Sequence, residues 1–581
     1  MSTKRRGAKY LALIAASSMA LAACSTGGGD SGSDETSDSG GTKDQTITIA
    51  WEQEFGAYNN NTADENATKN TIVLNQVMRG FWFFGSDGTV TPDTEFGTFE
   101  QTSQDPLKVK YTFDDKAAWS DGEPIDCDDF LLAWAANAGK YVTGEKDAEG
   151  NDVQVFSSAG TTGYELMQKP KCADGDKTVE VTYDKTFADW QGMFGGAGTI
   201  MPAHIVEKQS GVTDLVEAIE SDNLDELKKA GEFYNTGWVF NPGELKQDII
   251  PSSGPYLIKS WESGQSLTLE ANDKWWGTPP KAKTIVIRFI SGEQQAQALQ
   301  NNEVQLISPQ PQVDVVKQLE AIGESVKVTG GDRYIYEHLD YNFTGEFKDA
   351  DLRKAFALCV PRQTIIDNLI KPVNPNAEIM ESRYVFPFQS DYKDVSSAIQ
   401  DGTYDKVDIA AAKAIVESKG KTGMPVRIGY QTPNPRRTST VGLIRDSCNQ
   451  AGFDVQDAGQ EDFFGNGLAN GNFDVALFAW SGSPLVTGSS STFVTGGGNN
   501  NGKYTNPKVD ALIAELDITP DVDKQTDLIK QAEKIMWDDL ATVPLFVHPG
   551  LVSNSSTLEG VVFQPSQSEI TWNMQDWNIA S

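Results

Sequence analysis

The cysteine at position 24 has the clearest chemistry in this chain. It ends the run Leu21-Ala22-Ala23-Cys24, which follows four basic residues within the first nine positions and an apolar stretch over residues 10–20. A basic start, a short apolar stretch and small residues before a cleavage point are typical of a secretory signal peptide. The apolar stretch is too short to remain in a bilayer as a spanning helix. Because a cysteine thiol can carry acyl chains, the sequence predicts export and a lipid anchor at Cys24.

This arrangement resembles the lipobox of bacterial lipoproteins, in which the thiol is diacylated and the peptide bond before it is cut. The resemblance implies a signal peptide over 1–23 and Cys24 as the mature N-terminus. An ordinary secretory signal with an unrelated cysteine is the alternative. Residues 24–44 consist almost entirely of Gly, Ser, Thr and Asp, and such a composition predicts a flexible tether because no apolar residue favours an ordered structure.

The sequence contains no convincing catalytic motif. The histidines His204, His338 and His548 are far apart and form no HExxH pair, and no Ser or Cys has the surroundings of a nucleophile elbow. Residues 497–503 (GGNNNGK) nearly fit a phosphate-binding loop, but Tyr504 stands where the motif needs Ser or Thr. We therefore expect no catalytic residues, no metal and no cofactor. A hydrolase, whose nucleophile and histidine only folding would bring together, is the least supported alternative.

Four further cysteines, Cys127, Cys172, Cys359 and Cys448, form an even number in a chain expected outside the cytoplasm. Cysteines in an oxidising compartment usually pair, so we expect two disulfides. Four cysteines allow three pairings, and their spacing does not choose among them. The chain contains no CxxC, which disfavours a structural zinc site and a thioredoxin-type redox motif.

Composition and periodicity indicate a large mixed α/β chain. Its 581 residues are 39 % hydrophobic and carry a formal charge of -34, which becomes about -38 once the four basic residues of the signal segment are removed. Nucleic acids and anionic lipid surfaces bind basic patches, so neither is an expected partner. Strand patterns such as 45–51 and 107–113 alternate with helix patterns such as 128–136 and 524–539.

Several ordered segments resemble one family, the large extracytoplasmic solute-binding proteins that feed peptide, nickel and related ABC importers. The clearest segment is 111–130, which contains YTF and WSDGEPIDCDDF, an alternating strand followed by an Asp-Gly turn and a helix start. The others are SGPYL at 253–257, NDKWWG at 272–277, ALQNNEV at 298–304 and LDYN at 339–342. The resemblance covers the chain from about residue 45 to its end.

The resemblance implies an α/β, periplasmic-binding-protein-like fold of two lobes with a hinge and an extra inserted domain. Lobe I would be discontinuous, and the expected parts are lobe I at 45–85, 195–325 and 544–581, the inserted domain at 86–194 and lobe II at 326–543. Given this division we expect the disulfides Cys127–Cys172 and Cys359–Cys448, because each pair then falls within one part of the fold. The ligand would be enclosed between the lobes, and closure would report its presence to a transporter.

In peptide-binding members of this family, a Trp-x-x-Asp arrangement in lobe II holds the α-ammonium of the peptide. The matching stretch here is Trp480-Ser481-Gly482-Ser483, so a serine replaces the acid. A hydroxyl accepts a hydrogen bond but supplies no charge pairing, which weakens the expectation of peptide specificity. An aromatic wall beside a few polar groups is nevertheless typical of a ligand pocket.

We expect Trp480, Ser481, Gly482 and Ser483 to bind the ligand. Further expected ligand-binding residues are Tyr58, Asn59 and Asn60 after the first strand, Trp82 in an aromatic cluster, and Arg383 and Tyr384 in an irregular segment. Burial in a core or exposure on a loop is the alternative for each of them.

Together these features predict a monomeric, lipid-anchored receptor that does no chemistry and delivers a peptide or peptide-like solute to ABC permease subunits. A glycan, a nickel chelate or another polar metabolite stays open as the ligand. The expected location is the outer face of the cell membrane of a Gram-positive, actinobacterial cell. A role of a different class is the regulation of cell-envelope glycolipid assembly by a family member that no longer transports.

Overall fold

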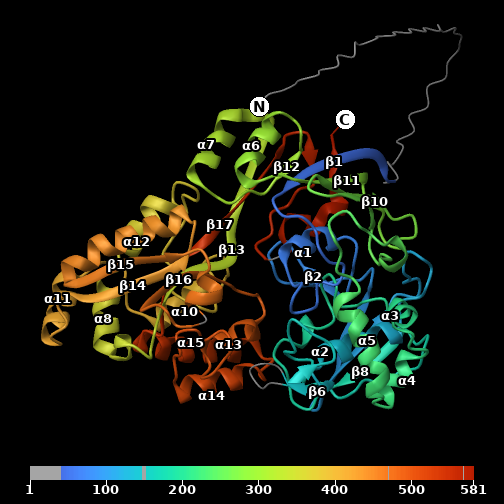
Figure 1. Ribbon diagram of the computed structural model, residues 1–581, viewed down its shortest axis with the longest axis horizontal. Helices are drawn as coiled ribbons and strands as arrows, with labels where there is room; N and C mark the ends of the chain where they lie inside the picture. Colours follow the sequence, from blue (N-terminus) through green and yellow to red (C-terminus); the bar gives the residue numbers. More distant parts are fainter. Residues whose placement is uncertain (1–40, 147–151, 469, 567, 581) are drawn as a thin grey trace, which may run out of the picture. The chain divides into compact units, whose positions relative to one another are not determined.

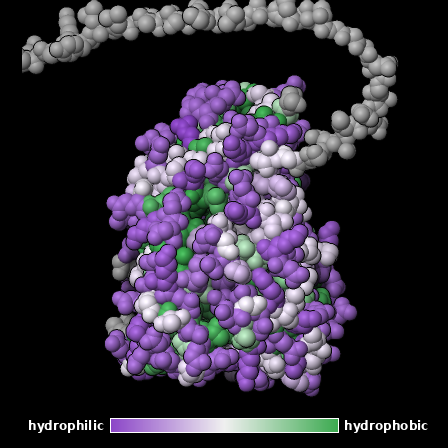
Figure 2. All heavy atoms as spheres, turned by 90° about the vertical axis from the view of Figure 1, so that its right-hand side faces the viewer, coloured by the Kyte–Doolittle hydropathy of each residue, from purple (hydrophilic) through white to green (hydrophobic). Residues whose placement is uncertain are grey.

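Figure 1 shows the computed structural model, which describes residues 41–146, 152–468, 470–566 and 568–580. The signal segment, Cys24 and the tether up to residue 40 lie outside these ranges, so lipidation stays a prediction. Within the described ranges no helix combines the length and the apolar character that crossing a bilayer requires. Figure 2 shows one face of the molecule, on which hydrophilic residues predominate and hydrophobic ones gather in a narrow band.

A ten-stranded mixed sheet runs through the described residues, in the order β15-β14-β16-β13-β17-β12-β1-β11-β10-β9. Its two longest strands, β13 (Val326–Tyr341) and β17 (Thr542–Ser555), pair antiparallel from Val326 opposite Ser555 to Asp340 opposite Thr542. The remaining strands are β1 (Lys43–Trp51), β9 (Tyr256–Glu262), β10 (Ser266–Ala271), β11 (Ala282–Phe289), β12 (Leu306–Ile307), β14 (Met424–Gln431), β15 (Phe453–Gln460) and β16 (Val475–Ser481). Because β13 and β17 pair with β16 at one end and with β12 at the other, they connect two halves of the sheet.

Separate hydrophobic cores lie on either side of this connection. The larger core consists of residues from 47–306 and 552–577. A separate small cluster has residues on β1, α6 (Gly292–Gln300) and α7 (Val313–Ile322), in the same part of the chain. The second core takes residues from 334–547. We call the parts of the chain around them lobe I (43–325 and 551–579) and lobe II (334–547). The boundaries expected from the sequence stay predictions.

The segment 86–194 has a small sheet of its own but no core of its own among the described residues. Its strands are β4 (Gly97–Gln104), β5 (Leu107–Phe113) and β8 (Thr178–Thr182), and alternate residues of β5 are buried, as its sequence pattern predicts. Helix α2 (Cys127–Asn137) begins with a capping box between Asp126 and Asp129, which satisfies two N–H groups of its first turn. The apolar side chains of β5 and α2 belong to the core of lobe I, so the inserted segment is packed onto that lobe.

Lobe I contains further short elements. They are α1 (Thr68–Leu74), β2 (Trp82–Phe84), β3 (Val90–Pro92), β6 (Val142–Lys146), β7 (Asp152–Gln154), η1 (Trp190–Gly192), α3 (Ala203–Ser210), α4 (Leu215–Glu220), α5 (Leu224–Thr236), η2 (Gln247–Ile249), η3 (Gly323–Ser325), β18 (Leu558–Glu559), η9 (Glu569–Asp576) and β19 (Asn578–Ile579). Strands β2 and β3 form a hairpin at the surface of the lobe.

In lobe II two groups of helices pack beside the strands (Figure 1). One group comprises α8 (Ala350–Cys359), α11 (Ile409–Ser418) and α12 (Pro435–Cys448), and the other comprises α10 (Tyr392–Ile399), α14 (Pro507–Leu516) and α15 (Val522–Asp539). Asn434 caps helix α12, because its side-chain oxygen accepts a hydrogen bond from the N–H of Arg437 at 3.0 Å. Pro435 occupies the first position of the helix. After β16 the chain forms η8 (Val486–Ser489) and α13 (Ser490–Phe493), and α13 contacts α14 of the second group.

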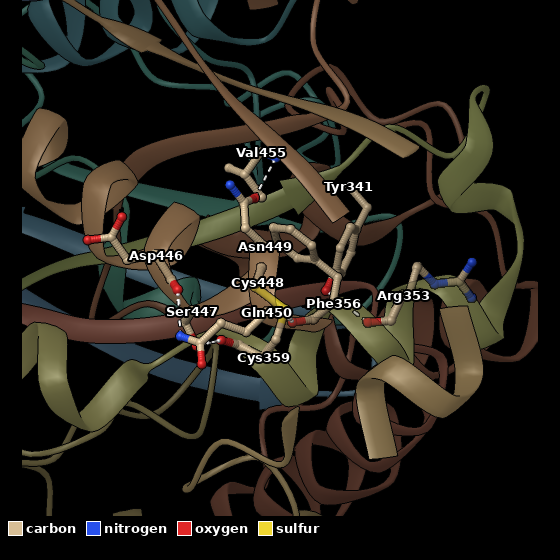
Figure 3. The surroundings of a disulfide bond; sticks show 10 residues. All are labelled: Tyr341, Arg353, Phe356, Cys359, Asp446, Ser447, Cys448, Asn449, Gln450 and Val455. Atoms are coloured by element: carbon tan, nitrogen blue, oxygen red, sulfur yellow. Dashed lines mark hydrogen bonds between the residues drawn. A yellow bond between two sulfur atoms is a disulfide. The ribbon is translucent and has the colours of Figure 1, made fainter. Parts of the chain in front are cut away.

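The structure contains both expected disulfides, Cys127–Cys172 and Cys359–Cys448. The second joins the end of α8 to the end of α12 and lies beside Phe356 (Figure 3). The hydroxyl of Ser447 donates to the carbonyl oxygen of Cys359 at 2.6 Å, which adds a hydrogen bond between the same two helix ends. The expected pairing is therefore confirmed.

Candidate functional site

A cleft of about 700 Å³ lies between the inserted segment and lobe II. Pockets of about 300–1,000 Å³ are typical of sites for small organic ligands. On the lobe I side its walls include Thr89, Val90, Gln101 and residues 188–192. On the lobe II side they include Tyr384, residues 483–486, residues 520–522, Gln525 and Thr526. Two of the expected ligand-binding residues, Tyr384 and Ser483, are thus in this cleft.

The stretch Trp480-Ser481-Gly482-Ser483 covers the last residues of β16 and the turn that follows. The Trp480 indole is partly buried, stacks on the His338 imidazole with ring centroids 6.0 Å apart, and meets the Phe478 ring edge-on at 5.0 Å. Its Nε1–H is buried without a hydrogen-bond partner. A buried donor left unpaired costs about 1–3 kcal/mol. Of this stretch only Ser483 is among the residues that line the cleft.

The turn after Trp480 brings Ser483 to the cleft. The N–H of Gly482 donates to the carbonyl oxygen of Tyr334, and a Cβ at this position would lie 2.6 Å from the Phe386 ring, so only glycine fits. Ser481 is exposed at the end of the strand. The Oγ of Ser483 accepts a hydrogen bond from the Leu485 N–H at 3.0 Å, which leaves its hydroxyl hydrogen free to turn toward a ligand.

A second, smaller cavity of about 260 Å³ lies within lobe I, between α1, β2 and η9. Two more expected residues, Asn60 and Trp82, line it, together with an ion pair in which Arg79 Nε is 2.6 Å from Asp93 Oδ2. The Arg79 guanidinium also lies 5.7 Å from the centre of the Phe83 ring. The Trp82 Nε1–H donates to the carbonyl oxygen of Met193, just after η1, at 3.0 Å.

Tyr58 and Asn59 are buried in lobe I instead of lining a cleft. The Tyr58 hydroxyl donates to the Pro251 carbonyl, and its ring lies 5.9 Å from the Trp238 ring. The Asn59 side chain donates to the Tyr234 carbonyl at 2.8 Å. Their polar groups are satisfied inside the protein, which is the usual condition of buried polar side chains. We therefore correct their assignment from ligand contact to structural support.

Arg383 is also buried, in lobe II. Its Nη1 is 2.7 Å from Glu533 Oε2, and neither side chain is exposed. Its Nε and Nη2 donate to the hydroxyl and the carbonyl of Thr542, each at 2.7 Å. A fully paired arginine of this kind does not reach the cleft, so Arg383 holds the segment that carries Tyr384 in place.

Several cleft residues were not expected from the sequence. Asp189, Trp190 and Gln191 of lobe I and Leu485 and Val486 of lobe II all line the larger cleft. The run Asp189-Trp190-Gln191-Gly192 combines an aromatic ring with polar neighbours and a glycine, the same signal that selected Trp480-Ser481-Gly482-Ser483. The same criterion applied along the whole chain would have found it.

One group of carboxylates could be considered for a cation. Ligand oxygens of Asp126, Asp128 and Asp174 lie within 4.8 Å of one another. Burial, together with the charge of Asp129, raises the pKa of Asp128. A protonated Asp128 carboxyl can donate a hydrogen bond to Asp126. The three carboxyl groups can therefore lie close together without a cation between them.

Comparisons with known proteins bear on the fold and the family. Residues 94–502 match the family described as bacterial extracellular solute-binding proteins, family 5 Middle. An uncharacterized lipoprotein of Mycobacterium tuberculosis is 30 % identical over 543 residues, which are 90 % of this chain and 91 % of the relative. The oligopeptide-binding protein OppA of the same species is 24 % identical over 85 % of this chain and 78 % of its own length. The solved periplasmic EDTA-binding protein EppA has a TM-score of 0.80 and 22 % identity, with 93 % of this chain and 97 % of that chain covered.

Proposed function

The chain belongs to family 5 of the bacterial extracellular solute-binding proteins, and from this premise we propose that it captures a solute outside the cell for an ABC importer. The observation that carries the proposal is the cleft of about 700 Å³ between the inserted segment and lobe II. Strands β13 and β17 connect the lobes. Movement of one lobe relative to the other about these strands can open and close the cleft. A receptor that encloses its ligand presents a different surface to the permease when loaded.

The proposed ligand is a peptide or a peptide-like solute. Ser483 supplies a hydroxyl to the cleft, and Trp480, three residues before it, carries a buried Nε1–H without a partner that a rearrangement of this turn could offer to a ligand. An amide-rich ligand offers carbonyl oxygens for the indole N–H and N–H groups for the hydroxyl oxygen. The name of the relative OppA, an oligopeptide-binding protein, supports this ligand class. EppA is named for binding EDTA, so other polar solutes are the alternative to test.

The proposal is a binding function without chemistry. Among the described residues that line the cleft there is no histidine. His204 pairs with Asp121 at 2.9 Å, and His548 pairs with Glu337 at 2.6 Å, both outside the cleft. Among the described residues, no histidine therefore lines the cleft beside Ser483 to activate its hydroxyl as a nucleophile.

The protein would act at the outer face of the cell membrane, held by acyl chains on Cys24. The lipobox-like sequence and the lipoprotein relative support this placement, and the mycobacterial source of that relative supports an actinobacterial host. Two acyl chains suffice for a stable anchor. The regulation of glycolipid assembly has no observation in its favour.

The test is native mass spectrometry of the mature domain, produced from Asp44 onward in an actinobacterial host, with denaturation to release and identify bound molecules. A heterogeneous set of short peptides would support the proposal. A single non-peptide species would replace the ligand class. An empty protein whose melting temperature does not rise with a peptide panel in excess would contradict peptide capture, since a ligand of the folded state must stabilise it.

Two substitutions at one position separate the parts of the site. In the Trp480→Phe variant the aromatic wall stays and the N–H is lost, whereas Trp480→Ala removes both. Peptide affinity should fall in the first and fall further in the second. Equal affinity in wild type and Trp480→Ala would place the ligand elsewhere.

A further inference from the structure

Asp189 of the inserted segment reaches across the cleft to lobe II. Its carboxylate accepts hydrogen bonds from the backbone N–H of Val486 at 3.3 Å, from the N–H of Thr487 at 2.8 Å and from the Thr487 hydroxyl at 2.7 Å. Thr487 is buried. Hydrogen bonds to an ionised acceptor are about twice as strong as neutral ones. One carboxylate therefore makes two short hydrogen bonds and one longer one between the lobes.

The residues beside Asp189 also contact lobe II. The N–H of Ala188 donates to the Asp517 carbonyl at 2.9 Å. A Cβ at Gly192 would lie 2.9 Å from both terminal carbons of the Leu485 side chain, so the backbone approaches Leu485 as closely as glycine permits. Five consecutive positions, 188–192, thus contain three contacts with lobe II, and these contacts lie at the edge of the cleft.

The lobe II loop held by Asp189 is the loop that carries the candidate ligand residue Ser483. The Leu485 N–H donates to Ser483 Oγ, and the next two residues donate to Asp189. Ser483, Leu485, Val486 and Asp189 all line the same cleft. The position of the Ser483 hydroxyl is therefore coupled through two peptide units to the contact between the lobes.

We propose that Asp189 is a latch: a positioning residue that fastens the 485–487 loop to the inserted segment when the cleft closes, and so sets the fraction of closed molecules. The inference rests on the proposed function in taking closure as the state that retains solute. The apparent affinity for a solute falls in proportion to the closed fraction. Asp189 thereby affects binding strength through the fraction of closed molecules.

The test measures closure without any solute. In the domain produced from Asp44 onward, spin labels at Lys116→Cys in the inserted segment and Lys508→Cys in α14 report the distance between the lobes. Both side chains are exposed, and the four native cysteines of this domain are in disulfides. Removal of three hydrogen bonds in Asp189→Ala should lower the closed-to-open ratio at least about tenfold and lengthen the distance. Asp184→Asn is the matched control, because this exposed acid of the same segment accepts from Gln168 within lobe I.

Two further variants keep the result interpretable. Thr487→Val removes one of the three bonds and should give an intermediate distance distribution, whereas Asp189→Glu keeps the charge and should recover part of the closed population. If Asp189→Ala and Asp184→Asn both show the wild-type distribution, the latch is refuted, whatever the melting temperature. A lower melting temperature with unchanged distances would assign Asp189 a role in stability only.

Failure of the latch and failure of solute capture are distinguishable. The distance between the labels is measured on empty protein. The test of the latch therefore remains valid even if no peptide of the panel binds. Where peptides from the panel do bind, Asp189→Ala should weaken them about tenfold or more while Asp184→Asn leaves them unchanged. Unchanged peptide affinity in a variant that is open when empty would contradict the coupling to Ser483.

Discussion

The guanidinium of Arg383 and the carboxylate of Glu533 form a completely buried ion pair in lobe II, with 2.7 Å between Nη1 and Oε2. The pair joins the irregular segment that contains Tyr384 to helix α15, and Thr542 of β17 accepts hydrogen bonds from the arginine Nε and Nη2. The other carboxylate oxygen of Glu533 accepts the Ser382 hydroxyl at 2.7 Å. Three elements are thereby fixed at the cleft wall that Tyr384 forms.

Breaking this pair should destabilise the protein strongly. Glu533→Gln or Arg383→Met leaves one charge buried without its partner, a change that typically costs about 3–5 kcal/mol. The free energy of unfolding in urea measures the effect. Glu180→Gln is the control, because its partner Lys108 is at 3.0 Å on the surface and such pairs contribute about 0–1 kcal/mol. Similar losses in the two experiments would contradict the structural role assigned to Arg383.

Removal of the disulfide between Cys359 and Cys448 should also lower stability. The bond closes a sequence separation of 89 residues, and loss of such a cross-link typically costs about 2–4 kcal/mol because the unfolded chain gains freedom. Replacement of both cysteines by alanine, followed by urea unfolding, measures this loss. The same replacement at Cys127 and Cys172, which are 45 residues apart, should cost about 0.6 kcal/mol less by loop length alone.

A single substitution tests whether Ser483 occupies the place of a missing acid. Ser483→Asp should tighten the binding of peptides with a free α-ammonium about tenfold, because a carboxylate adds charge pairing to the hydrogen bond. Isothermal titration with a peptide and its N-acetylated form measures the change. The acetylated form serves as the control, since it carries no ammonium. An equal gain for both forms would show that the new acid does not meet the peptide N-terminus.

Elements with a strong local pattern could be predicted from the sequence. The alternation over Leu107–Phe113 became β5 with the same bounds, and the Asp-rich start after residue 125 became the capping box of α2. The resemblance to solute-binding proteins supplied the two-lobed fold, which local patterns do not contain. It also led to the correct disulfide pairing, which spacing alone left open.

The site was harder to predict because burial depends on partners far away in the sequence. Tyr58 and Arg383 are polar enough for a cleft, but Pro251 and Glu533 satisfy their hydrogen bonds inside the protein. Asp189 and Thr487 are 298 positions apart, and no local pattern connects them. The inserted segment was expected as a separate domain, yet its apolar residues complete the core of lobe I, which periodicity does not reveal.

The carboxyl of Asp517 should make stability depend on pH. Burial, together with the negative charges of Asp189 and Glu165, raises its pKa to about 6, although the hydrogen bond from the Ser490 hydroxyl opposes the rise. Because the folded state favours the protonated acid relative to the unfolded state, this group contributes stability below its unfolded pKa of about 4 that is lost as pH rises through about 6. Wild-type protein should therefore lose part of its unfolding free energy between pH 4 and pH 7.

The variant Asp517→Asn isolates this contribution, because an amide keeps the shape of the acid and does not titrate. The difference in unfolding free energy between wild type and variant should shift in favour of the variant as pH rises from 4 to 7, since wild type alone then carries a buried charge. Asp332, whose pKa burial also raises to about 6, is present in both proteins and cancels from the difference. A difference that stays constant across this range would show that Asp517 titrates as an exposed acid. The contact between Ala188 and the Asp517 backbone would then lie in a solvated edge of the cleft, and the closed state would gain little from excluding water there.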